Sequence, residues 1–310
     1  MGSLYALALD RKGTTVKNIR EKHFTYLMLL AMFFWGGGWT ALKILTYNLP
    51  MDVIIFWRFF LMSLAFLPIL YFVRIPFKLN IHGLKYIFGS SVLNISFMIS
   101  SFMGIKYGYA GAGSVIMTTF SPIMTFLLIA VLFRKRLHAK QYFGLILGLI
   151  GGYTLLGLND FSHFLNSSNL YFLLCATIWA GVTLLSQYSQ KHIHPIHYSF
   201  AISLVATIVT FLYAKDSALE SVLHQGVEFW MAMIYLAIFG QAIATTIFFI
   251  ASGKLGSEKT SSFMFLVPLF ALFSAWLILE EPMQLHIIIG GGVSMFAVYF
   301  INSQYRIKNR

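Results

Sequence analysis

Charge is scarce in this sequence. Only 10% of its 310 residues are Asp, Glu, Lys or Arg, whereas 58% are hydrophobic and 31 are Phe. About a quarter of the residues in a soluble domain are charged, so this chain has too few to cover a surface that faces water. The composition excludes an ordinary soluble domain and predicts an integral membrane protein.

Cysteine and acidic residues are also few. The single cysteine, Cys175, lies in an apolar run, can form no disulfide within the chain, and is interpreted as a small buried hydrophobic residue. The net charge of +12 would suggest nucleic acid as the partner of a soluble protein. In a membrane protein, basic residues in short loops are a requirement of topology, so no nucleic acid partner is expected.

Motifs that carry enzyme chemistry are missing. The sequence has no His-Glu-x-x-His, no Gly-x-Ser-x-Gly and no close Asp pair, and it is therefore not expected to be an enzyme. The segment from His192 to His197 contains three histidines but no neighbouring Cys or carboxylate, so neither a metal site nor a cofactor is expected. No Asp or Glu falls in the middle of a predicted span, so no proton relay is visible.

The first 23 residues are mixed and basic, and the first long apolar run starts at Phe24. That run is long enough to cross a hydrocarbon core of about 30 Å, unlike the short core of a cleavable signal peptide. We therefore expect residues 1–23 to form a cytoplasmic leader and residues 303–310 a cytoplasmic tail.

Windows of about 20 apolar residues predict ten transmembrane helices and an all-α integral membrane fold. The predicted spans are 24–43, 53–73, 84–103, 108–132, 140–158, 168–187, 197–214, 229–251, 260–279 and 284–302.

The basic residues orient these spans. With the N-terminus inside, 18 of the 22 Lys and Arg residues fall on the inner side, and seven of the ten acidic residues fall on the outer side. Because basic loops stay in the cytoplasm, both termini are expected there, in a multi-pass protein of the cell (inner) membrane.

Two segments about 146 residues apart share one pattern. Each starts with small residues, continues as an apolar helix with one internal proline (Pro122 or Pro268), and ends in charge. The first ends in Arg134–Lys135–Arg136 and the second in Glu280–Glu281. Opposite charge indicates opposite directions in the membrane, which predicts two inverted five-helix repeats, as in many transporters. The repeats are expected at residues 24–158 and 168–302.

Several elements resemble a known family. Trp35–Gly36, Lys43, Pro50 and the Phe56–Phe59 segment are similar to the opening of the EamA family of the drug/metabolite transporter superfamily, and the two proline helices fit the same pattern. Relatives often have a glutamate at the end of the first proline helix, where this chain has Lys135, so that glutamate's role does not carry over. The resemblance implies a ten-helix carrier of small metabolites, with a central cavity lined by spans 1, 3, 4, 6, 8 and 9.

Arg58 is the outstanding polar residue within a predicted span. It follows Asp52 by six residues, which places it about 9 Å into the membrane at 1.5 Å per residue. An Arg facing lipid at that depth is unfavourable by a few kcal/mol. Arg58 is therefore expected either to bind substrate or act in gating, or to bond backbone carbonyls near the outer mouth.

Aromatic and polar side chains in the spans complete the set of candidates for substrate binding. Trp35 and Trp39 share a helix face, and Trp179 is the counterpart of Trp35 in the second half. They are expected to line the pocket or simply to pack. The hydrogen-bonding candidates, whose hydroxyls can instead satisfy their own helix backbone, are Asn94, Ser101, Thr118, Thr119, Gln187, Gln241, Thr245 and Ser262.

Pro122 and Pro268 remove backbone hydrogen bonds and are expected to bend their helices, either as hinges or as static kinks.

The leading hypothesis is a secondary transporter that exports amino acids or related zwitterions and amines by alternating access. Intramembrane positive charge without a matching acid favours a substrate that bears a carboxylate. The alternatives are uptake of a nucleoside-like or S-adenosylmethionine-like metabolite, and a structural membrane protein without transport. The expected partners are a small-molecule substrate and the lipid bilayer; a homodimer stays open.

Overall fold

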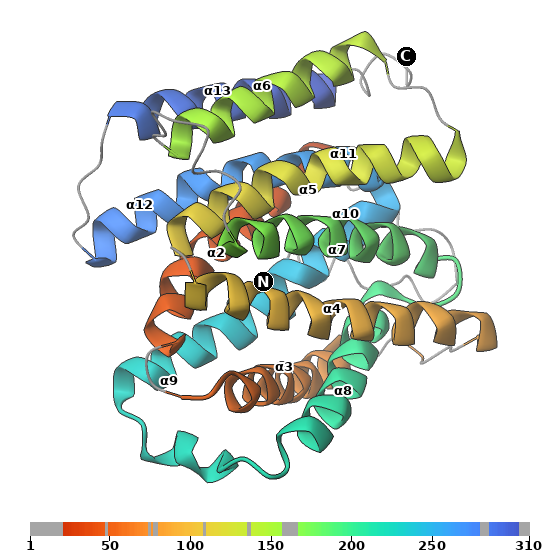
Figure 1. Cartoon of the computed structure of the whole chain (residues 1–310). Coiled ribbons are helices and arrows are strands. Elements are labelled where there is room, and N and C mark those ends of the chain that lie inside the picture. Colours follow the sequence, from red (N-terminus) through yellow and green to blue (C-terminus); the bar gives the residue numbers. More distant parts are fainter. Residues whose placement is uncertain are drawn as a thin grey trace.

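The computed structural model describes residues 21–46, 49–73, 76, 80–107, 110–134, 138–156, 167–279 and 285–303. Every regular element within these ranges is helical (Figure 1). The all-α fold class is therefore confirmed for the described part of the chain. Lys135, Asp160, Glu280 and Glu281 lie outside the described residues, as do most of the leader and the tail.

Eight described segments are long and apolar enough to cross a membrane. They are Phe24–Thr46, Met51–Phe72, Ile81–Tyr107, Gly113–Phe133, Ser168–Ser189, Pro195–Ala214, Val227–Leu255 and Ser257–Ile278. These segments belong to α2 (Glu21–Thr46), α3 (Met51–Val73), α4 (Ile81–Tyr107), α5 (Ala110–Phe133), α7 (Ser167–Ser189), α8 (Pro195–Ala214) and the two broken helices described below.

The fifth and tenth predicted spans correspond to α6 (Ala139–Leu156) and α13 (Leu285–Ser303). Neither is among the eight segments, and the apolar part of α13, Ile288–Ile301, is shorter than a full span. Ten membrane-spanning helices thus remain a prediction, although each predicted span contains a helix.

The eighth span is a broken helix. It runs as α9 (Val227–Ile234), the π-helix η3 (Tyr235–Thr245) and α10 (Thr246–Leu255). A π-helix bonds each N–H to the carbonyl five residues earlier and occurs often at functional sites. An 11-residue π segment is therefore a notable local departure in the centre of the bundle.

The ninth span is broken at its proline. It runs as α11 (Ser257–Ser262), the 3₁₀ turn η4 (Phe263–Leu266) and α12 (Val267–Leu279). Pro268 lacks the N–H that would bond the Met264 carbonyl, and its ring crowds that carbonyl. The carbonyl accepts instead from Val267 in the tighter 3₁₀ pattern. Pro122 lies within α5, which continues as an α-helix on both sides of it.

The helices pack in pairs. α6 and α13 lie along one edge of the bundle and α3 and α8 at the opposite edge (Figure 1). Between them α7 packs against α4 and α5, while α2 packs against η3 and α12. If each helix is replaced by its equivalent in the other half, the α6–α13 and α3–α8 pairs are converted into themselves. The α4–α7 pair becomes α2–η3, and the α5–α7 pair becomes α2–α12.

Two side-chain contacts join residues that are 144 positions apart. The rings of Trp35 and Trp179 meet edge to face with centroids 5.2 Å apart. The hydroxyls of Ser63 on α3 and Thr207 on α8 lie within hydrogen-bond distance, at 3.2 Å. Where a two-fold axis relates two halves of a chain, residues at equivalent positions meet on that axis.

The glycines of α6 serve helix packing. A Cβ at Gly144 would meet Ala297 and Ile301 of α13, and one at Gly152 would meet Thr119 of α5. Small residues permit such close approach in lipid, where no hydrophobic force drives helices together.

The predicted loop between the eighth and ninth spans is almost absent. Gly256 alone separates α10 from α11, and its φ of +88° lies in the left-handed region that favours glycine. Glu258 and Lys259, expected in that loop, are helical and buried. Glu258 lies at the start of the ninth span and not in its middle, so it does not contradict the expectation that no Asp or Glu falls mid-span.

His194 closes the turn that precedes α8. Its Nδ1 accepts a hydrogen bond of 3.3 Å from the backbone N–H of Ile196. Burial, together with neighbouring His197 and Lys254, lowers the pKa of His194 from 6.5 to about 4. The side chain is therefore neutral at pH 7 and can accept this bond.

We expect His194 to make stability depend on pH. Its folded pKa lies below its unfolded value, so the unfolded chain binds a proton first as the pH falls from 6.5 towards about 4. The native protein should lose stability across this window relative to His194→Asn, which keeps a helix cap but does not titrate there. Thermal unfolding in detergent at several pH values checks this; parallel pH profiles for the two proteins would contradict it.

Candidate functional site

A cavity of about 100 Å³ lies in the middle of the helix bundle. Both halves of the chain line it. The first half contributes residues of α2, α3, α4 and α5, and the second contributes residues of α7, α8, η3, α10, η4 and α12. The lining therefore includes α3 and α8, the second and seventh spans, in addition to the six spans implied by the family resemblance.

Nine of the twelve predicted substrate-binding residues line this cavity. They are Trp35, Trp39, Arg58, Asn94, Ser101, Thr118, Trp179, Gln241 and Thr245. Residues of six separate elements thus converge on one space, as the hypothesis of a central site requires.

The other three predicted residues do not line it. Thr119 faces Gly152 of α6. The Ser262 hydroxyl donates to the carbonyl of Lys259 in its own helix. Gln187 accepts from both the backbone N–H and the hydroxyl of Ser257, so it joins α7 to the start of α11.

Arg58 is the only charged residue among the described residues that line the cavity. Its side chain is 5% exposed, and Nε has no hydrogen-bond partner. No ion pair or hydrogen bond of the guanidinium is present within the part of the chain that the structure describes. An unpaired buried cation is costly, so Arg58 is suited to receive an anion.

Trp35 and Trp179 form the aromatic centre of the site. The Trp35 indole N–H donates to the Gly240 carbonyl at 2.9 Å, which fixes that ring against η3. The Trp179 indole N–H is buried without a partner in the described structure. Phe97 and Phe248 also contact Trp179, with ring centroids 5.2 and 5.9 Å from it.

The hydroxyl groups of the lining are occupied by their own helices. Ser101 donates to Met98, Thr118 to Ser114 and Thr245 to Gly240. These are the backbone bonds that Ser and Thr commonly make in membrane helices. The amides of Asn94 and Gln241 are therefore the more available neutral polar groups of the site.

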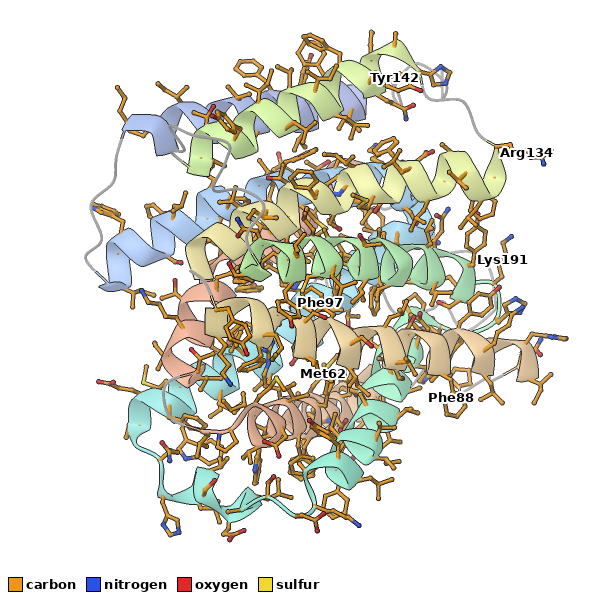
Figure 2. The ribbon with its side chains drawn as sticks, viewed as in Figure 1. Met62, Phe88, Phe97, Arg134, Tyr142 and Lys191 are labelled. Carbon is orange, nitrogen blue, oxygen red and sulfur yellow. The ribbon has the colours of Figure 1, made fainter. Side chains whose placement is uncertain are left out.

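Methionines are among the lining residues that were not predicted from the sequence. Met62, Met98, Met117 and Met264 each line the cavity from a different element. Figure 2 shows Met62 and Phe97 inside the bundle, whereas Phe88 and Tyr142, both about half exposed, project from its outside. An apolar side chain in an apolar helix carries no signal in the sequence, so only packing could reveal these four.

No group of three or more His, Cys, Asp or Glu residues is close enough to hold a metal ion within the described ranges. Cys175 is fully buried, as expected.

The model of the EamA-like transporter family matches this chain twice, at residues 25–157 and 166–303. The two matches together cover most of the chain. They fall on the two halves that pack against each other in the bundle.

Named relatives are transporters. An uncharacterized transporter of Synechocystis sp. is 28% identical over 222 residues, covering 66% of this chain and 67% of its own. A probable amino-acid metabolite efflux pump of Salmonella typhimurium is 26% identical over 295 residues, covering 89% and 93%. The corresponding pump of Escherichia coli is 25% identical, covering 88% and 92%.

A solved crystal structure has the same fold. It superposes with a TM-score of 0.71 at 16% identity, and the match covers 93% of this chain and 99% of that chain.

The two tryptophans provide a matched test of the hydrogen bonding in the site. Trp35→Phe removes a bonded N–H, whereas Trp179→Phe removes one without a partner. Trp35→Phe should therefore destabilise the protein by about 1 kcal/mol more than Trp179→Phe. Thermal unfolding of both variants in the same detergent measures the difference; an equal or larger loss for Trp179→Phe would show that the bond to Gly240 contributes nothing.

Proposed function

Because the chain belongs to the EamA-like transporter family, whose model covers both of its halves, we propose that it is a secondary transporter of small metabolites bearing a carboxylate. Amino acids and related zwitterions or amines are the proposed substrates, moved outward by alternating access. Two relatives named as probable amino-acid metabolite efflux pumps support this substrate class and direction.

The observation that carries the proposal is Arg58. A guanidinium can hold a carboxylate with two parallel hydrogen bonds, which is the strongest recognition that this lining offers. Around Arg58 the lining is apolar and aromatic, so the attraction to an anion is screened less than it would be in water. A neutral substrate would leave this buried charge unpaired.

Ten spans in two inverted repeats, 24–158 and 168–302, complete the proposed architecture. The exchange symmetry of the helix pairs and the contacts between positions 144 apart support it. In such an arrangement the two mouths of the cavity are built from equivalent helices, so one rocking motion can close one mouth and open the other.

The proposed location is the cell inner membrane with both termini in the cytoplasm. The excess of Lys and Arg on one side of the predicted spans supports this orientation. Arg134 and Lys191, far apart in sequence, lie at the same end of the bundle (Figure 2), and this is the proposed cytoplasmic end.

The broken eighth and ninth spans are the proposed moving parts. η3 and η4 both line the cavity, and each departs from α-helical bonding where it does so. A segment with altered backbone bonding can change shape at lower cost than a regular helix. Pro122 and Pro268 are the proposed bends.

We expect Arg58→Ala to lower counterflow of radiolabelled L-amino acids into proteoliposomes by at least about tenfold, because a substrate carboxylate loses the one cationic partner that the described residues of the cavity provide. Arg58→Lys should keep part of the flux, since lysine keeps the charge but cannot form the two parallel hydrogen bonds to a carboxylate. Arg134→Ala, at the end of the bundle, is the control and should transport normally.

Size-exclusion profiles establish that each variant is folded. Native-level flux in folded Arg58→Ala would refute the role of this residue. Absence of flux for every amino acid in the native protein would refute amino acids as substrates.

A further inference from the structure

Asn94 presents an acceptor to the cavity. Its side chain is 6% exposed and lies on α4, where Nδ2 donates to the Ser90 carbonyl of the same helix at 2.7 Å. This bond fixes the amide, because the reverse orientation would set two oxygens against each other. The Oδ1 atom is therefore directed away from its own helix, and the described structure contains no donor bonded to it.

Gln241 presents a second acceptor. It lies in the π-helix η3, is 7% exposed and lines the same cavity. Its Oε1 is buried and has no hydrogen-bond partner among the described residues. Burying an amide oxygen without a hydrogen bond is unfavourable, so a donor from the substrate would stabilise it.

The tryptophan pair contacts residues close in sequence to each of the two amides. Trp35 bonds the carbonyl of Gly240, the residue before Gln241. Its partner Trp179 contacts Phe97, one helical turn after Asn94. These two electron-rich rings line the same cavity as both amides, and such rings attract cations.

The polar groups of the lining require two different kinds of partner. Arg58, the one cation among the described residues of the lining, requires an anion, while the two amide oxygens require donors. A simple carboxylate would satisfy Arg58 and leave both oxygens unpaired. A group with several N–H donors and a positive charge satisfies them together with the aromatic faces.

We infer that Asn94 and Gln241 bind the ammonium group of the substrate while Arg58 binds its carboxylate, so that the site selects α-amino acids over acids that lack the amine. The inference rests on the proposed transport function and names the substrate class for the same cavity. The other described residues of the wall include four methionines and several aromatic rings, and none of them is charged. It therefore fits neutral, bulky side chains, and the flexible thioethers adapt to several shapes.

Binding to purified protein in detergent tests the inference. The probes are L-phenylalanine, L-leucine and L-methionine, each paired with the acid that lacks only the amine: phenylpropionate, isocaproate and methylthiobutyrate. Isothermal titration calorimetry should give amino acids an affinity at least about tenfold higher than that of their paired acids.

The variant Gln241→Met keeps the length of the side chain and removes the amide. It should weaken L-phenylalanine binding by at least about fivefold and change phenylpropionate binding by less than about twofold. Asn94→Leu should act in the same direction. Gln225→Met makes the same chemical change in the turn after η2 (Leu219–His224), outside the cavity lining, and should leave both affinities unchanged.

The outcomes separate this inference from the proposed function. Equal affinity for amino acids and their paired acids, with both lost in Arg58→Ala, would overturn the ammonium site and leave carboxylate transport intact. A preference that persists in folded Gln241→Met and Asn94→Leu would also overturn it. No binding of any of the six probes would overturn both proposals.

Discussion

A chain that crosses hydrocarbon must satisfy its backbone N–H and C=O groups within itself, because no water is present to do so. The long apolar helices meet this requirement, and the exceptions are confined to the interior. η3 and η4 depart from α-helical bonding where they line the cavity, and the hydroxyls of the lining turn back to their own helices. Two segments of irregular backbone and several polar side chains thus meet at one central space.

The polar groups that remain without partners define the chemistry of that space. Arg58, Trp179 and Gln241 each have a buried polar atom that bonds to nothing in the described structure. Each belongs to a different element, so these atoms share a site only because the helices meet there. The core of a soluble domain usually pairs such atoms; in the proposed function they are available to a substrate.

Much of the site could be predicted because a polar residue stands out in an apolar span. Arg58, Asn94 and Gln241 were identified for this reason, and all three line the cavity. Thr119, next to the lining residue Thr118, points instead to α6, since adjacent residues on a helix face directions about 100° apart. Spacing in the sequence gives the direction of each side chain around its own helix. It does not show which face of that helix the neighbouring helices cover. The methionines of the lining could not be predicted, because burial in the core and exposure to lipid favour the same residue types.

The sequence by itself determined the membrane location, the all-helical fold and the duplicated pattern of the two halves, because hydropathy and charge act on each span separately. It also determined which residues are costly in lipid and so require a partner. Tertiary structure alone decided which of them share a cavity, which hydroxyls are already bonded, and that the eighth and ninth spans are broken where they meet that cavity. Those properties depend on distances between helices, and such distances arise only when side chains from both halves pack together.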